Sequence, residues 1–207
     1  MKTLSETLES LETMHQRLND HLFSGQLLPV VITIAPDANK GKKGTLYGHF
    51  TTNKVWKDQT SSDRYYEINV YSEFLARPIK EVIGTLLHEM VHEYCAQQGI
   101  KDTSRQGHWH NDLFKQQAML HGLTVEKSDK NGWNVTSLKD DVDQYLQQFD
   151  DYKNYELQRD YDKAIIRNVT KSKSIKYVCP HCGAIVRATR ELRILCGECG
   201  VEFKAEL

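Results

Sequence analysis

The sequence has no long hydrophobic run. No window approaches the roughly 18 consecutive apolar residues of a membrane-spanning helix, so we expect no membrane partner. Residues 1–23 carry acidic side chains throughout and offer no apolar segment of secretory length, which argues against a signal peptide. These two absences predict a soluble, cytoplasmic protein.

The chain also has almost no net charge. Its 27 basic and 28 acidic residues give a formal charge of −1, which excludes a uniformly basic nucleic-acid-binding protein. The charges are nevertheless separated along the chain: residues 138–162 hold eight acidic and three basic side chains, whereas residues 163–207 hold nine basic and four acidic ones. This reversal predicts a domain boundary near Ser172, so that 207 residues form one substantial core and a small second module.

Cysteines are few, and four of the five form a pattern. Cys179 and Cys182 make one C-x-x-C pair, and Cys196 and Cys199 make a second pair, with thirteen residues between the two pairs. Two such turns can direct four thiolates at one metal ion, which predicts a closed, structural zinc site. Two disulfides and a redox pair are the alternatives, and neither suits a cytoplasmic chain with two matching pairs. Cys95 has no partner and is expected in the core.

Hydrophobic periodicity predicts an α+β fold. Apolar residues at helical spacing indicate helices over 4–23, 78–98 and 111–121, and an acidic, helix-compatible segment extends from 138 to about 168. β-branched and aromatic residues indicate three strands, within 29–36, 45–56 and 64–75. We expect the helices to pack on a small, three-stranded antiparallel sheet.

The helix expected over 78–98 contains the sequence H-E-x-x-H. Residues four apart on a helix share a face, so His88 and His92 can direct their imidazoles at a common point, with Glu89 beside it. Two neutral imidazoles suit a zinc ligand pair, and the carboxylate suits a general base that takes a proton from the attacking water. A chance match is the alternative. It is disfavoured because an apolar helix buries these polar groups at a cost unless they bind something.

A catalytic zinc needs a third protein ligand, and "GHWHNDLF" offers two candidates. His110 immediately precedes Asn111, a good helix N-cap, and stands four residues before Phe114, so a helix terminus would hold it in place. His108 lies further out in a glycine-containing loop and is the alternative ligand, or a residue that faces the second coordination shell or the substrate. The sequence favours His110 without excluding His108.

The predicted C-terminal module carries basic and aromatic side chains that could contact nucleic acid. Basic groups can bind phosphates, and aromatic rings can stack on the bases of a single strand. The alternative is a solvated basic surface, and the sequence does not separate the two. The candidate residues are Lys173, Lys176, Tyr177, Arg187, Arg190 and Arg193.

Taken in order, "GHFTTNKVW", "YYEINVYSEF", "LLHEMVHEYC", "GHWHNDLF" and the paired C-x-x-C module resemble the SprT-like metallopeptidases, a family that includes the eukaryotic protease Spartan. The resemblance implies a zincin-like catalytic domain over residues 1–136 and a zinc ribbon over 172–207. The acidic helical connector expected over 137–171 departs from the family, because it is longer than the short connection that the resemblance implies. The resemblance also implies that His88, His92 and a third histidine four residues before a phenylalanine, as His110 is, hold the catalytic zinc, and that Glu89 is the general base.

The expected function is therefore a zinc metalloendopeptidase with two Zn²⁺ ions per chain, one catalytic and one structural. Spartan cleaves proteins crosslinked to DNA, so the resemblance adds DNA-associated proteins as candidate substrates and DNA, single-stranded DNA above all, as a candidate partner. The alternative is a nucleic-acid-binding module whose histidine site is vestigial or structural. The intact glutamate favours the peptidase.

Overall fold

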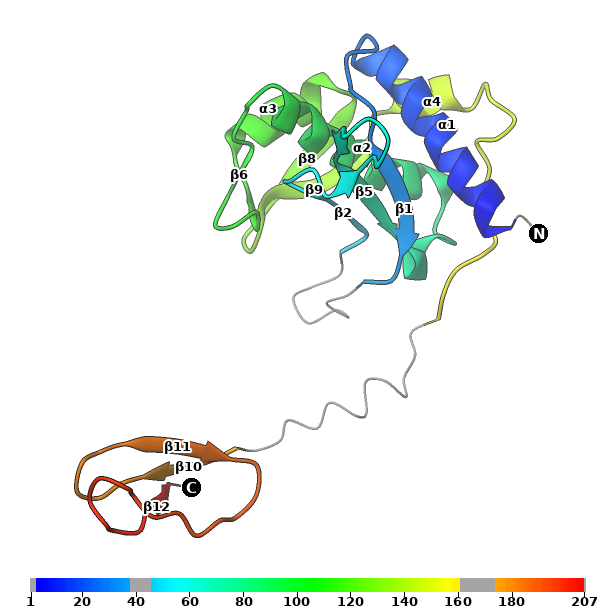
Figure 1. Cartoon of the computed structure of the whole chain (residues 1–207). Helices are drawn as coiled ribbons and strands as arrows, with labels where there is room; N and C mark the ends of the chain where they lie inside the picture. Colours follow the sequence, from blue (N-terminus) through cyan, green and yellow to red (C-terminus); the bar gives the residue numbers. More distant parts are fainter. Residues whose placement is uncertain (1–2, 38–45, 161–173, 207) are drawn as a thin grey trace. The chain divides into compact units, whose positions relative to one another are not determined.

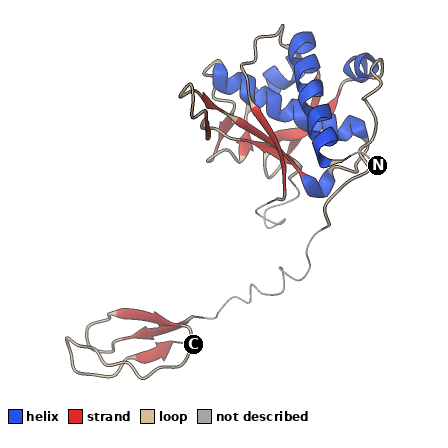
Figure 2. Ribbon diagram, turned by 45° about the vertical axis from the view of Figure 1, so that its right-hand side comes forward, coloured by secondary structure: helices blue, strands red, loops and turns tan. Residues whose placement is uncertain are grey.

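The protein is a mixed α+β structure with four α-helices and several small sheets among the described residues (Figures 1 and 2). The computed structural model describes residues 3–37, 46–160 and 174–206. The chain divides into two compact units, Met1–Asp160 and Tyr161–Leu207, which are called the N-terminal and C-terminal units below. No helix in the described ranges is both long and apolar enough to cross a membrane.

The chain begins with α1 (Leu4–Leu22), which confirms the first predicted helix. Thr3 and Glu6 form a capping box at its N-terminus, in which each side chain binds the other residue's backbone N–H. Its apolar stripe packs into the core through Leu11, Met14 and Leu18, all fully buried. The helix therefore starts and faces inward as its sequence pattern indicates.

The first sheet has the strand order β1 (Val31–Ala35), β5 (Glu67–Tyr71), β2 (Gly48–Phe50). β2 runs antiparallel to β5 as predicted, but β1 runs parallel to it, so the prediction of an all-antiparallel sheet is wrong. Two parallel strands need a connection that brings the chain back from the end of the first strand to the level of its start. The segment between β1 and β5 is long enough to do this, which permits their parallel pairing. The strands expected within 45–56 and 64–75 are shorter than predicted. The end of the first segment and the start of the second form a separate antiparallel pair, β3 (Trp56–Lys57) and β4 (Arg64–Tyr65).

A second sheet was not predicted. Its order is β6 (Thr103–Ser104), β7 (Trp109–His110), β9 (Gly132–Leu138), β8 (Leu123–Ser128). The sequence signal was the Asn131-Gly132 dipeptide between two alternating segments, which is typical of a hairpin. Gly132 has φ +73°, and a Cβ there would lie 2.2 Å from the carbonyl oxygen of His110. Glycine is therefore required for β9 to approach β7.

The helix α2 (Ile79–Gln97) is the central element of the N-terminal unit, as the sequence predicted for residues 78–98. It contacts α1, α3 (Asp112–Leu120) and strands of both larger sheets. Six of its apolar side chains are fully buried: Val82, Ile83, Leu86, Leu87, Met90 and Val91. Because α2 lies between the sheets, Glu89 and Glu93 on it are buried, and His88 and His92 are half-buried. Asn111 caps α3 by accepting from the backbone N–H groups of Leu113 and Phe114.

The segment after β9 belongs to the N-terminal unit up to Asp160, and the boundary expected at residue 136 falls inside β9. Only α4 (Asp140–Leu146) of the expected acidic helix is helical between Leu138 and Asp160, and residues 161–173 lie outside the described ranges. Val142, Leu146 and Tyr155 are spaced among the acidic residues and pack into the core. These three side chains are the physical reason that the acidic segment is not a free connector.

A short 3₁₀ helix, η1 (Ser72–Phe74), links β5 to α2, and the segment after α4 packs near it. Asn154 accepts a hydrogen bond at 2.7 Å from the backbone N–H of Ile79, the first residue of α2. The N-cap of α2 is Pro78, which makes no side-chain cap, so Asn154 satisfies a donor that the helix leaves open. Arg159 pairs with the buried Glu73 of η1 at 3.2 Å.

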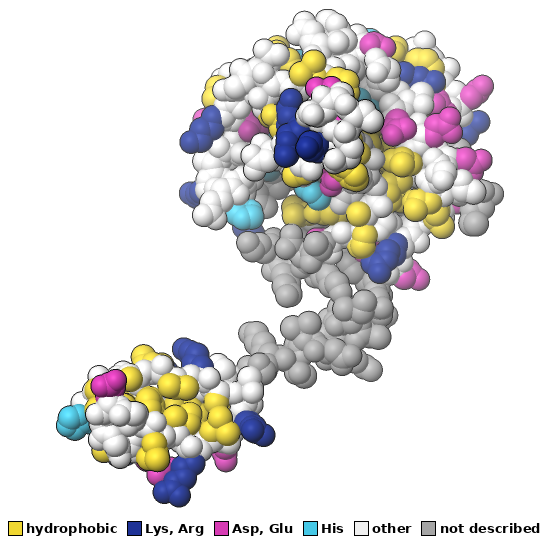
Figure 3. Space-filling model, in the orientation of Figure 1, with side chains coloured by type: hydrophobic (Ala, Val, Ile, Leu, Met, Phe, Trp, Pro, Cys, Tyr) yellow, Lys and Arg dark blue, Asp and Glu magenta, His cyan; other side chains and the backbone are white. Residues whose placement is uncertain are grey.

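The C-terminal unit is a three-stranded antiparallel sheet of order β11 (Ile185–Ala188), β10 (Ile175–Val178), β12 (Lys204–Glu206). Its buried cluster is small: Tyr177, Cys179, Cys196 and Phe203. Hydrophobic side chains gather on the face seen in Figure 3. The large hydrophobic residues that this unit leaves exposed are Ile185, Val186, Leu192 and Leu195. So small a core supplies little folding free energy.

Candidate metal centres

Three histidines from different elements converge in the N-terminal unit. His88 and His92 lie one turn apart on α2, and His110 ends β7. The Nε2 atom of His110 lies 3.1 Å from Nε2 of His88 and 3.1 Å from Nε2 of His92. The fully buried ring of Phe114 contacts all three imidazoles, with ring centroids 4.6 to 4.8 Å apart. The three imidazoles are therefore packed against the ring of Phe114.

The outer nitrogen of each ring has an acceptor of its own. Nδ1 of His88 faces Thr136 Oγ1 at 2.9 Å, Nδ1 of His110 faces the Asn131 carbonyl at 3.3 Å, and Nδ1 of His92 faces the carboxylate of Asp102. When these Nδ1 atoms carry the protons, the three Nε2 atoms are unprotonated and their lone pairs repel one another. A cation bound between them removes this repulsion. In protein metal sites, each histidine ligand is oriented by a hydrogen bond from its other ring nitrogen, as here.

The donor set fits zinc. Three nitrogens bound at about 2.0–2.1 Å to one tetrahedral zinc would lie about 3.3 Å from each other, close to the observed spacing. Burial lowers the pKa of His88 below its ordinary value and lowers that of His110 to about 4. Both rings are therefore neutral at pH 7, which is the form that binds metal. The three histidines could hold a metal ion.

Glu89 lies beside the imidazoles and is buried. A Cβ at Gly48 on β2 would stand 3.5 Å from Glu89 Oε1, an ordinary contact, but only 2.8 Å from the carbonyl oxygen of Asn69, so glycine is required for β2 to approach β5 beside the carboxylate. Burial raises the pKa of Glu89 to about 7, against smaller opposing effects of His92 and the backbone N–H of Phe50. A carboxyl group with a pKa near 7 can both accept and return a proton at neutral pH.

Two cavities meet at this cluster. One has a volume of about 510 Å³ and the other about 370 Å³, and both are lined by His88, Glu89 and His110. Gly48 on β2 and Asn134 on β9 also line both. The cluster therefore lies in a groove that continues on two sides, with strands of the two sheets at its walls.

The two candidates for the third ligand are placed differently. His110 is in the cluster, whereas His108 is exposed and lines only the smaller cavity. His108 follows a left-handed turn at Arg105, Gln106 and Gly107, which have φ of 52°, 59° and 85°. The structure therefore assembles a three-histidine group with His110 and leaves His108 facing the groove.

This difference predicts distinct metal contents for two histidine variants. His110→Ala should lose the zinc held by the cluster, because two imidazoles on one helix leave the metal without a third protein ligand. His108→Ala should retain it. Zinc per chain, measured by mass spectrometry of the native protein, should fall by one in the first variant only; equal loss in both, or loss only in His108→Ala, would contradict the assignment.

The residues that orient the ligands were not found from the sequence. Asp102 lies in a polar loop ten residues after His92, and nothing in its local pattern distinguishes it from other exposed acidic residues. Besides His92, it interacts with the thiol of Cys95, whose pKa burial raises to about 12. Cys95 is fully buried, as predicted for a core residue. Thr136 and Asn131 reach the site from the unpredicted β8–β9 hairpin.

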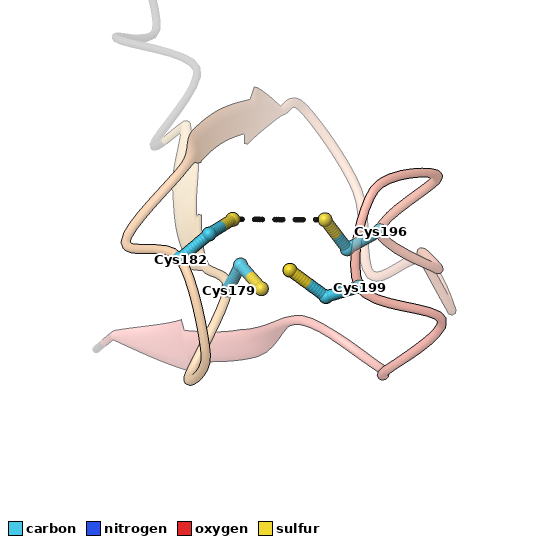
Figure 4. Close-up of side chains that lie close together, drawn as sticks. All are labelled: Cys179, Cys182, Cys196 and Cys199. Carbon is cyan, nitrogen blue, oxygen red and sulfur yellow. Dashed lines mark hydrogen bonds between the residues drawn. The ribbon is translucent and has the colours of Figure 1, made fainter.

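In the C-terminal unit, the four cysteines of the two C-x-x-C pairs cluster together (Figure 4). Their sulfur atoms lie within 4.8 Å of one another, and the Sγ atoms of Cys182 and Cys196 are 3.7 Å apart. Four thiolates at these distances could hold a metal ion, and the unit is compatible with a zinc ribbon. His181 is exposed between the ligands of the first pair and is not part of the cluster.

The two C-x-x-C turns have the same backbone pattern. Gly183 and Gly200 each follow the second cysteine of a pair, have φ of +76° and +65°, and donate their N–H to the carbonyl of the first cysteine. The backbone N–H groups of Cys182 and His181 lower the pKa of Cys179 to about 6. A lowered pKa favours the thiolate, which is the metal-binding form.

The residues considered for nucleic-acid binding do not form one exposed cluster. Tyr177 is buried in the C-terminal unit and its hydroxyl accepts from the N–H of Leu192, so its ring is not a stacking surface for bases and this prediction is wrong. Lys176 pairs with Glu206 and Arg193 with Glu202. Arg187 and Arg190 are exposed, and Lys173 lies outside the described residues.

Comparisons with protein-family models, curated proteins and solved structures give no match for this chain.

Proposed function

We propose that the protein is a zinc-dependent metallopeptidase of the SprT-like type, with a zincin-like N-terminal unit and a zinc ribbon at the C-terminus. The observation that carries this proposal is the convergence of three Nε2 atoms beside the buried carboxylate of Glu89, in a groove open on two sides. A purely structural metal site has no need of a proton acceptor with a pKa near 7 next to it.

His88, His92 and His110 would hold the catalytic zinc. When bound, zinc polarises the scissile carbonyl and lowers the pKa of water, so that attack occurs at neutral pH. Glu89 takes one proton as the water oxygen bonds to the carbonyl carbon and the C=O π electrons move onto the carbonyl oxygen. The oxyanion's electron pair then re-forms the C=O bond while the C–N bond breaks, and its electrons pass to nitrogen, which takes the proton back from Glu89. The products are a carboxylic acid and an amine.

The groove suits an extended polypeptide. β2 is an edge strand of its sheet, and all three of its residues, Gly48, His49 and Phe50, line the smaller cavity. An edge strand offers backbone N–H and C=O groups with which an extended peptide can pair. This supports protein substrates, with DNA-associated proteins as one proposed class. The nucleic-acid-binding alternative is weakened because Tyr177 is buried, and the described residues add no observation in its favour.

Removal and return of zinc test the proposal. The protein loaded with two zinc ions should cleave fluorescein-labelled casein, and the same protein stripped by chelator should not, because without the Lewis acid neither the water nor the carbonyl is activated. Adding zinc back should restore cleavage, and measurements with and without single-stranded DNA would reveal activation. Failure of the zinc-loaded protein to cleave would overturn the proposal.

A further inference from the structure

The strand β9 presents alternate residues to the histidine cluster. Thr136 contacts the ring of His88, and Gly132 abuts the backbone of His110 so closely that no Cβ fits. Side chains two apart on a strand share a face and lie roughly 7 Å from each other. Asn134 stands between Gly132 and Thr136 and so faces the same way. Trp133 faces the other side, where its Nε1–H donates to Asp112 Oδ1 and its ring lies under Lys115 Nζ.

Asn134 occupies the middle of the groove. It lines both the larger and the smaller cavity, together with His88, Glu89 and His110. It is half-buried, so its amide is accessible to a bound molecule. Among the residues that line both cavities, it offers a neutral side-chain N–H donor, whereas the histidine nitrogens and the carboxylate already have roles.

The β8–β9 turn fixes which end of this amide is free. Ser128 Oγ donates to Asn134 Oδ1 at 2.5 Å, and the same Oγ accepts the backbone N–H of Asn131 at 3.2 Å. Asn131 in turn supplies the carbonyl that faces His110 Nδ1. With Oδ1 engaged, Nδ2 is the available end, and within the described part of the chain it makes no hydrogen bond. One turn thus orients both the third histidine and the amide.

We infer that, in the peptidase proposed above, Asn134 Nδ2 donates a hydrogen bond to the oxyanion that forms on the scissile carbonyl. As the water oxygen bonds to carbon, the C=O π electrons move onto the carbonyl oxygen and make it negative. A preoriented donor binds that oxygen more strongly than it binds the carbonyl of the substrate, which lowers the barrier. No proton is transferred, since Asn134 keeps its hydrogen throughout. Asn134 is therefore a catalytic residue of the proposed reaction.

The test compares Asn134→Ala and Asn134→Asp with wild type, using Asn53→Ala as the control. Asn53 is exposed and lines neither cavity, and aspartate keeps the size of asparagine while removing the N–H donor. Both Asn134 variants should lower kcat on fluorescein-labelled casein by about 10²–10³-fold, the usual effect of losing one oxyanion donor. KM and zinc per chain should stay near the wild-type values, and Asn53→Ala should be unchanged.

A phosphinic peptide, whose tetrahedral phosphinate mimics the oxyanion, provides a readout that a structural role would not move. Asn134→Ala should weaken its inhibition by the same factor as kcat/KM falls. Wild-type kcat in both Asn134 variants would overturn the inference and leave the peptidase proposal standing. Loss of zinc from both variants would overturn it in favour of metal binding. A zinc-loaded wild-type protein that cleaves nothing would overturn both proposals.

Discussion

Glu89→Gln should abolish peptide hydrolysis while the catalytic zinc stays bound. Glutamine has nearly the same shape as glutamate but no basic oxygen, so it cannot take the proton from the attacking water. General base catalysis contributes about 10²–10⁴-fold to rate. We expect a loss at the upper end, because in the proposed mechanism Glu89 also returns the proton to the leaving nitrogen. The zinc should remain because the proposed ligands are the three imidazoles, and Glu89 is not part of the group that could hold a metal ion.

The measurement is casein cleavage together with zinc per chain. Glu12→Gln provides a matched control, since Glu12 is exposed on α1 and lines neither cavity. It should behave as wild type. Two outcomes would count against the mechanism: cleavage by Glu89→Gln at the wild-type rate would place the general base elsewhere, and loss of zinc from Glu89→Gln would make the carboxylate part of the metal site.

Cys196→Ser should unfold the C-terminal unit and leave the N-terminal unit intact. Among the described residues of this unit, the buried cluster is Tyr177, Phe203 and two of the four clustered cysteines, and four large hydrophobic residues stay exposed, so little apolar burial supports the fold. Structural zinc supplies about 10–16 kcal/mol of binding free energy in small zinc modules, far more than so small a core can replace. Cys196 is a buried cluster member, and serine is a poor zinc ligand.

Zinc per chain should fall from two to one in Cys196→Ser, and the amide signals of residues 174–206 in a ¹H–¹⁵N NMR spectrum should collapse to unfolded positions. The amide signals of the N-terminal unit should stay dispersed and casein cleavage should continue, because that unit is expected to keep its fold. His181→Ala is the control, because His181 lies within the first C-x-x-C pair yet is outside the cluster. If Cys196→Ser kept two zinc ions and a dispersed spectrum, the structural role of the metal would be refuted.

Several features followed from the sequence because they depend on neighbours along the chain. Apolar spacing is a local property, and it located α1, α2 and α3 to within a residue or two. The H-E-x-x-H spacing placed His88 and His92 on one face of a helix by geometry alone. The C-x-x-C turns are equally local: a cysteine pair and the glycine after it determine where two sulfur atoms point.

Other features depend on which distant segments meet, and for these the sequence pattern was insufficient. The parallel pairing of β1 with β5, the pairing of β7 with β9 and the packing of Val142, Leu146 and Tyr155 all rest on contacts between residues far apart in the chain. Strand propensity identifies an extended segment but does not specify its partner or direction. Tyr177 was misjudged for the same reason, since its burial comes from packing against Cys196 and Phe203, which follow it by about 20 residues or more in the chain.

At the histidine site, the sequence by itself determined the two helical imidazoles and the carboxylate between them, because one helical turn suffices to align them. Only the tertiary structure decided that His110, rather than His108, joins them, since that choice depends on β7 pairing with β9 through Gly132. It also supplied Asp102, Thr136 and Asn134, whose positions arise from the folding of separate loops and strands around α2. Residue types and their spacing along the chain determine which side chains can act as ligands, and long-range packing determines how those side chains are oriented.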